Sequence, residues 1–132
     1  RSEFVARFIG GANILRGTAL DATHVSVAGT PLLVAGDGRH GQRPVSLSIR
    51  QHEIALSPAR GGAGASGNVP GGNVLPAVVA RQVFLGSVRD YTVTLADGTE
   101  LRVTAPPDCN IAPGEAVSLV LPADRCRVLA ED

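Results

Sequence analysis

Apolar and polar positions alternate over most of this chain, which is the pattern of β-strands with one buried face. Residues 45–50, for example, place Val, Leu and Ile at every second position, with Ser and Arg between them. We expect about ten short strands, at residues 13–20, 25–28, 31–35, 45–50, 54–56, 74–86, 91–96, 101–103, 117–121 and 126–129. Many short strands separated by Gly, Pro and Asp turns predict a mainly β fold of the barrel or sandwich type.

Two segments depart from this alternation. Residues 1–9 carry apolar side chains at helical spacing after Ser2, so they predict one short N-terminal helix that ends at Gly10-Gly11. Residues 58–73 contain Gly, Ala, Ser, Asn and Pro with almost nothing to bury, as in a linker or a long loop. The predicted organisation is therefore a helix and junction at 1–12, a first β-unit at 13–57, a Gly-rich linker at 58–73 and a second β-unit at 74–132.

The two sides of the linker resemble each other. The triplet Val-Ser-Leu at 45–47 recurs at 117–119, and the apolar positions that follow it keep the same spacing. The hairpin segment 29–34 is echoed in the same way by 98–103. Two similar β-halves that pack together would let each small unit complete a hydrophobic core.

Composition removes several classes of function. All 12 basic residues are arginines, so the chain holds neither the lysine of a P-loop nor that of a Schiff-base enzyme. Net charge is zero and aromatic residues make up 3%, which argues against nucleic-acid binding. No apolar run approaches the roughly 20 residues of a membrane span, and no signal peptide is recognised. Because methionine is absent, we expect a fragment of a longer protein.

Candidate catalytic chemistry is sparse. Cys109 and Cys126 are separated by 17 positions without a CxxC motif, and we interpret them as reduced thiols. His24, His40 and His52 are scattered, and no serine lies in a GxSxG context. We therefore predict no catalytic, cofactor-binding or metal-binding residues.

Arg50 is the candidate site residue. It ends an alternating strand and is followed by Gln51, His52 and Glu53, so its guanidinium could contact an anion or a regulator. The alternative is an exposed strand-end arginine that is paired with a local acid.

Three stretches resemble one protein family. Residues 3–10 (EFVARFIG), followed by Asn13, resemble the junction after the nucleotide-binding domain in ATP-binding subunits of bacterial ABC importers. Residues 48–54 (SIRQHEI) are similar to an IRPE segment of these subunits. Residues 77–98, with Phe-Leu-Gly, Tyr-Thr-Val and an Asp-Gly turn, resemble the transport-associated OB (TOBE) module, and the PGEAVSL segment with the closing Val-Leu continues the match.

The resemblance implies a C-terminal regulatory domain of OB-like barrel units with no activity of its own. The ATPase domain, with its ATP and Mg²⁺, would lie before Arg1. The implied partners are a second copy of the ATP-binding subunit and the permease subunits, on the cytoplasmic face of the bacterial inner membrane. The opening is most similar to the spermidine/putrescine and ferric-iron import group. Gln51 stands where the family usually has Pro, which implies a looser turn after Arg50.

Two alternatives remain open. One is a small-ligand or oxyanion-binding TOBE module, in which backbone amides and serines such as Ser46 or Ser118 would hold the ligand. The other is a free-standing OB-fold binder of nucleic acid, which the neutral charge and scarce aromatic residues oppose.

Overall fold

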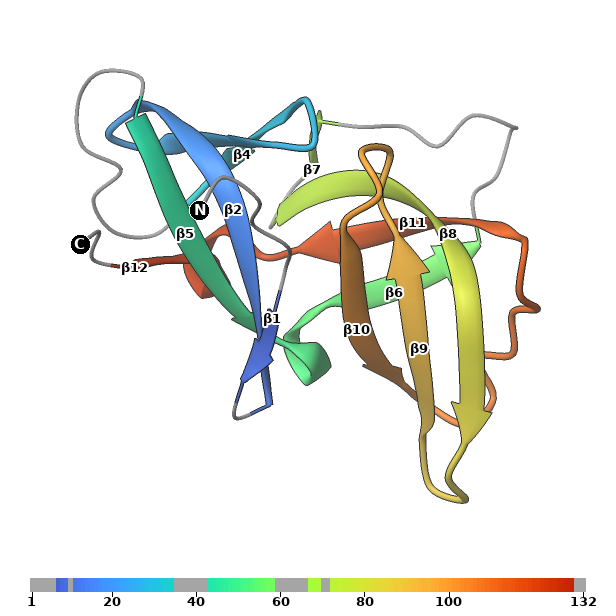
Figure 1. Ribbon diagram of the computed structural model, residues 1–132. Coiled ribbons are helices and arrows are strands. Elements are labelled where there is room, and N and C mark those ends of the chain that lie inside the picture. Colours follow the sequence, from blue (N-terminus) through green and yellow to red (C-terminus); the bar gives the residue numbers. More distant parts are fainter. Residues whose placement is uncertain (1–6, 10, 35–42, 59–66, 70–71, 130–132) are drawn as a thin grey trace.

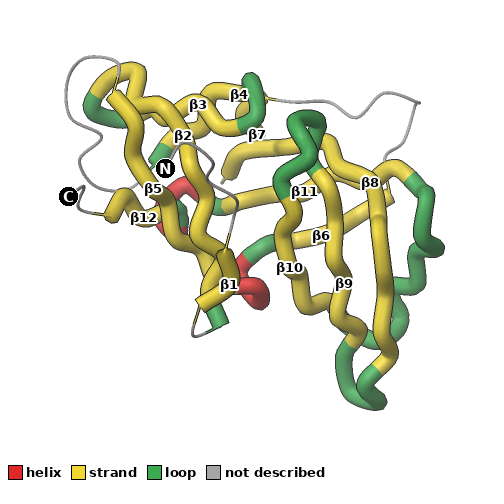
Figure 2. Tube along the Cα trace, viewed as in Figure 1, coloured by secondary structure: helices red, strands yellow, loops and turns green. Residues whose placement is uncertain are grey.

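Two antiparallel sheets of six strands form the molecule (Figures 1 and 2). The computed structural model describes residues 7–9, 11–34, 43–58, 67–69 and 72–129. The first sheet has the order β12-β5-β2-β3-β4, with β1 on β2, and comprises β1 (Arg7–Ile9), β2 (Ala12–Asp21), β3 (His24–Val27), β4 (Thr30–Leu33), β5 (Arg43–Arg50) and β12 (Arg127–Leu129). The second has the order β10-β9-β8-β11-β6, with β7 on β8, and comprises β6 (Ala55–Pro58), β7 (Gly67–Val69), β8 (Gly72–Phe84), β9 (Arg89–Thr94), β10 (Glu100–Ala105) and β11 (Ala116–Leu121). The mainly β fold is confirmed.

The two sheets are copies of each other, down to their register. In the first sheet Asn13 lies opposite Ile49, and in the second sheet Asn73 lies opposite Leu121. A β-bulge after Ala19 in β2 recurs after Val79 in β8. The repeat that the Val-Ser-Leu triplets indicated is thus a structural duplication of five paired strands and one additional strand.

Each half gives its last strand to the other half's sheet. After β5 the chain passes through the 3-10 helix η1 (Gln51–Glu53) and pairs β6 with β11 of the second sheet. After β11 it passes through η2 (Ala123–Arg125) and pairs β12 with β5 of the first sheet. Figure 1 shows these two crossings between the sheets. Each sheet is therefore built from residues on both sides of the Gly-rich segment, and the unit boundaries at 57 and 74 stay a prediction.

Two local predictions need correction. Arg7–Ile9 forms strand β1 rather than the end of a helix, because Gly11 (φ 83°) turns the chain and lets these residues pair with β2. A short isolated helix is only marginally stable in water, so the hydrogen-bonded pairing of β1 with β2 forms instead. Within the expected linker, Gly67–Val69 forms β7 and Gly72 begins β8. Residues 1–6, 10, 59–66 and 70–71 lie outside the described part.

The core is mainly aliphatic, in agreement with an aromatic content of only 3%. Inward side chains of both sheets join in one cluster in which Tyr91 is the largest member. Tight turns connect the strands where Gly-containing pairs were expected, with Ala28 and Gly29 at φ 52° and 82° and Gly98 at φ 92°. No helix in the described residues has the length and apolarity to cross a bilayer.

A buried asparagine joins the first sheet to the edge of the second. Asn13 of β2 is 2% exposed. Its Oδ1 accepts the N–H of Arg102 at 2.8 Å, and its Nδ2 donates to the carbonyl of Arg102 at 2.9 Å. The side-chain amide thus bonds β10 as a neighbouring peptide group would.

Asn73 makes the equivalent link in the opposite direction. Fully buried in β8, it accepts the N–H of Leu33 at 2.8 Å and donates to the carbonyl of Leu33 at 2.9 Å. A further donation reaches the carbonyl of Leu121 at 3.1 Å. Asn13 and Asn73 therefore form a reciprocal pair, which we call the asparagine clasps, and each fastens an edge strand of the other sheet.

Replacement of Asn73 by Ala should lower the free energy of unfolding by about 2–4 kcal/mol, because it leaves backbone groups of Leu33 and Leu121 buried without partners. Asn13→Ala should cost a similar amount, and Asn73→Asp at least as much, since a carboxylate oxygen would face two carbonyl oxygens. Urea denaturation measures these changes. The exposed Asn110→Ala serves as control, with an expected loss under about 1 kcal/mol. An unchanged midpoint for Asn73→Ala would contradict the importance of the clasps.

Candidate functional site

Arg50 lies where the chain leaves the first sheet. It is the last residue of β5 and is exposed. Its backbone N–H donates to Oε1 of Glu53 at 2.9 Å, and the next N–H, of Gln51, donates to the carbonyl of Gly11 at 3.3 Å. These bonds fix the start of η1. The role of Arg50 as an anion or regulatory contact stays a prediction.

Glu53 makes most of the polar contacts at this junction. Its side chain is 8% exposed. Arg127 of the exchanged strand β12 donates from Nη1 to Oε1 at 3.0 Å and from Nη2 to Oε2 at 2.9 Å. Arg125 adds a contact from Nη1 to Oε2 at 3.3 Å. The paired, nearly parallel bonds from Arg127 tie η1 to the far end of the chain.

The hydrogen bonds from Arg127 hold the pKa of Glu53 at about 2, below its ordinary 4.5, and they outweigh the opposing effect of burial. The backbone N–H of Arg50 and the charges of Arg127 and Arg125 act in the same direction. The same contact raises the pKa of Arg127. Glu53 is therefore charged throughout the physiological range.

Gln51 ties the same junction to the second sheet. Its Nε2 donates to Oγ1 of Thr104 and lies 3.5 Å from Oδ1 of Asp90. Where we expected a looser turn, the side chain of Gln51 holds η1 against β9 and β10. An amide at this position makes contacts that a proline ring has no donor to make.

The two serines considered for ligand binding occupy equivalent strand positions. Ser46 lies in β5 and Ser118 in β11, and both are half-buried. In register, Ser46 is opposite Arg16 and Ser118 is opposite Pro76. Each serine thus belongs to a different sheet.

The cysteines and histidines that the structure describes form no metal-binding cluster. Cys126 is buried and Cys109 half-buried, and both are free thiols. Burial raises the pKa of Cys126 to about 11, so it remains protonated and weakly nucleophilic. His24 contacts a turn aspartate and His52 is exposed, while His40 lies outside the described residues. In the described part of the chain, no three His, Cys, Asp or Glu side chains cluster as metal ligands.

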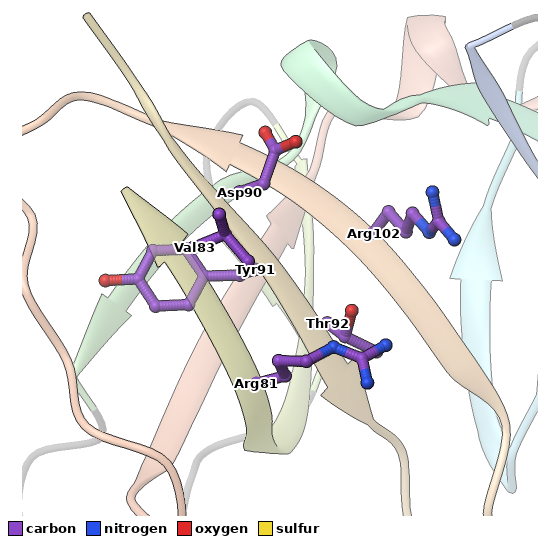
Figure 3. A pocket seen from close by; sticks show the side chains of 6 residues that line it. All are labelled: Arg81, Val83, Asp90, Tyr91, Thr92 and Arg102. Atoms are coloured by element: carbon purple, nitrogen blue, oxygen red, sulfur yellow. The ribbon is translucent and has the colours of Figure 1, made fainter. Parts of the chain in front are cut away.

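A shallow pocket lies on the outer face of the second sheet (Figure 3). Its volume is about 180 Å³, below the roughly 300–1,000 Å³ of small-molecule sites. Arg81 reaches toward Thr92, and Asp90 stands at the other end. The lining residues are Arg81, Val83, Asp90, Tyr91, Thr92 and Arg102. This pocket was not anticipated from the sequence, because its members come from three strands that only the register brings together.

Two interlocked OB-like β-units place this chain in a class of small, mainly β modules. The model of the TOBE domain family matches residues 47–129. This chain belongs to the TOBE domain family.

The relatives that match this chain are longer proteins than the chain itself. The sulfate/thiosulfate import ATP-binding protein CysA 1 of Chromobacterium violaceum is 35% identical over 99% of this chain and 34% of its own length. The spermidine/putrescine import ATP-binding protein PotA 1 of Pseudomonas aeruginosa is 33% identical over 98% of this chain and 35% of its own length. The chain thus spans about a third of these relatives.

A solved structure shares the fold. The cytoplasmic molybdate-binding protein ModG, in a form with molybdate bound, superposes with a TM-score of 0.75 over 95% of this chain and all of that chain. Sequence identity is 16%, so this likeness concerns the fold alone.

Replacement of Glu53 by Gln should lower the free energy of unfolding at pH 7 by about 1–3 kcal/mol, since it removes charge-assisted bonds from Arg127. With its folded-state pKa near 2 and its ordinary value at 4.5, Glu53 stabilises the fold above pH 4.5, and this stabilisation is lost as the pH falls toward 2. The variant should therefore show a flatter acid limb in urea titrations between these pH values.

A matched control is Asp21→Asn. The pKa of Asp21 is also held at about 2, mainly by the N–H of Thr23, but this carboxylate is exposed. It should account for the smaller part of the acid limb. An acid limb of unchanged slope in Glu53→Gln would contradict a stabilising role for the Arg127 contact.

Proposed function

We propose that this chain is the regulatory domain of the ATP-binding subunit of an ABC importer and has no catalytic activity of its own. The observation that carries the proposal is the match to import ATP-binding proteins over nearly the whole chain at 33–35% identity. The match of residues 47–129 to the TOBE domain family agrees with this proposal. In the parent protein, ATP and Mg²⁺ would be bound by a separate ATPase domain.

The partners and place of the parent protein follow from the same proposal. A second copy of the ATP-binding subunit would pair with it, and permease subunits would contact its ATPase domain. The complex would sit on the cytoplasmic face of the bacterial inner membrane, with this subunit peripheral. Spermidine and putrescine are the substrate class that we favour, because PotA proteins of four organisms are among the relatives. Ferric iron, which the opening segment also suggested, remains a prediction.

Oxyanion binding is a second candidate. It is favoured by one feature of the junction, where the guanidinium groups of Arg125 and Arg127 contact a single carboxylate, Glu53, which also accepts the backbone N–H of Arg50. This excess of guanidinium groups would suit a tetrahedral dianion.

A chimaera tests the leading proposal. In PotA 1 of Pseudomonas aeruginosa, the region that matches this chain is replaced by these 132 residues. We expect the chimaera to restore spermidine uptake to a strain that lacks the subunit, whereas a truncated subunit and a chimaera with an unrelated β-domain do not. The isolated chain should show no ATP hydrolysis. A chimaera that accumulates and hydrolyses ATP but gives no uptake would contradict the proposal.

Thermal denaturation with molybdate, tungstate, sulfate, phosphate or spermidine tests the second candidate. An oxyanion at 100 times its Kd should stabilise the chain by about 2.7 kcal/mol. Arg50→Ala should abolish that shift, and Arg81→Ala, an exposed strand arginine in the other sheet, should leave it intact. If none of the oxyanions shifts the transition, or if Arg50→Ala retains the full shift, the second candidate is wrong.

A further inference from the structure

Opposite charges lie in the pocket of the second sheet without pairing with each other. Arg81 of β8 and Asp90 of β9 both line it, and they are diagonal neighbours because Arg81 is opposite Thr92. Diagonal neighbours on one face of a sheet are about 7–8 Å apart, which an arginine side chain can span. Within the part of the chain that the structure describes, however, Arg81 makes no ion pair or side-chain hydrogen bond. The pocket therefore presents two charges of opposite sign to any ligand that enters it.

The acidic end of the pocket is fixed by neighbouring polar side chains. Oδ1 of Asp90 lies 3.4 Å from the hydroxyl of Thr104 and 3.5 Å from Nε2 of Gln51. Both neighbours lie on the β10 side of β9, whereas Arg81 lies on the β8 side. Among the described residues, none donates a hydrogen bond to the other oxygen, Oδ2. That oxygen can accept a bond from a cationic group of a ligand.

The basic end of the pocket is centred on Thr92. Arg81 and Arg102 are its cross-strand neighbours on β8 and β10, so the three side chains project from the same face. Figure 3 shows Arg81 reaching toward Thr92. The hydroxyl of Thr92 can donate a hydrogen bond, and guanidinium groups form forked bonds with carboxylates. This end therefore suits a carboxylate.

Strand geometry sets the distance between the two ends. Asp90 and Thr92 are two residues apart on β9, which is about 6.6–6.8 Å along an antiparallel strand. The ammonium and carboxylate groups of an α-amino acid share one carbon, so they are too close together to reach both ends. Three bonds of an extended chain cover 3.8 Å, as between successive Cα atoms, so five bonds cover about 6 Å. A chain with its charged groups at opposite ends fits this spacing.

The size and lining of the pocket suit the same kind of molecule. Its volume of about 180 Å³ excludes drug-sized ligands. Val83 lies opposite Asp90 and is 46% exposed, so it offers an apolar contact to the methylene groups between the two charges.

We propose that this pocket binds a small ω-amino acid, with its carboxylate at Arg81 and Thr92 and its ammonium group at Asp90. An inorganic oxyanion has no group for Asp90, and a diamine would place a cation against Arg81. The site shares no residue with the junction at Glu53 and does not depend on the proposed function. Because the pocket is shallow and water screens its charges, the Kd should be on the order of 1–10 mM.

NMR titration of the isotope-labelled 132-residue chain with 4-aminobutanoate tests the inference, since it detects binding of this strength. We expect saturable shifts of the backbone amide signals of Thr92 and its neighbours on β8 and β10. Arg81→Gln and Asp90→Asn should each raise the Kd about three- to fivefold. The matched control is Glu100→Gln, which removes an exposed carboxylate opposite Thr94 and outside the pocket and should leave the Kd unchanged. The signals of the rest of the chain check that each variant is folded.

A series of ligands tests both ends of the pocket on the unaltered protein. Butanoate lacks the ammonium group, butylamine lacks the carboxylate and glycine is too short, so each should bind at least about threefold more weakly than 4-aminobutanoate. Equal binding of butanoate, phosphate or 1,4-diaminobutane would overturn the inference. So would the absence of any shift at Thr92 with about 100 mM 4-aminobutanoate, ten times the weakest Kd expected.

Discussion

The two asparagine clasps are the interaction on which this fold depends. Asn13 and Asn73 each place a side-chain amide in the position of a peptide group and complete the hydrogen bonds of an edge strand in the opposite sheet. An unpaired edge inside the molecule would leave buried polar groups unsatisfied, and an apolar residue at either position could not correct this. The clasps therefore fix which edge meets which sheet, while the aliphatic core provides most of the free energy but little of the specificity.

Strand exchange and the charged junction also hold the two sheets to each other. Because β6 and β12 each pair in the other half's sheet, neither sheet is complete without both halves of the chain. Ion pairs join the two crossings to each other, because Glu53 of η1 contacts both Arg125 of η2 and Arg127, which begins β12. A backbone bond from Arg125 to Pro122 also closes η2. The two crossings thus hold opposite charges, although they are equivalent parts of the duplication.

Much of the fold could be predicted from the sequence, because alternation of apolar positions and Gly-containing turns act locally. The Val-Ser-Leu repeat likewise indicated the duplication. The clasps were missed, although Asn-Ile-Leu at 13–15 and Asn-Val-Leu at 73–75 are a visible signal. The exchange of strands and the pocket around Thr92 depend on register between distant segments, which no local pattern encodes. Residues 7–9 were assigned to a helix because a few apolar positions fit both the helical and the strand periodicity.

The first and last described strands, β1 and β12, both belong to the first sheet. Only the first sheet is therefore continuous with whatever precedes or follows in a longer chain, and the second sheet is attached to it sideways, through η1, η2 and the clasps. A rotation of one sheet against the other would have to break the clasp hydrogen bonds and the contacts of the shared core, so we expect the two sheets to move as one rigid body.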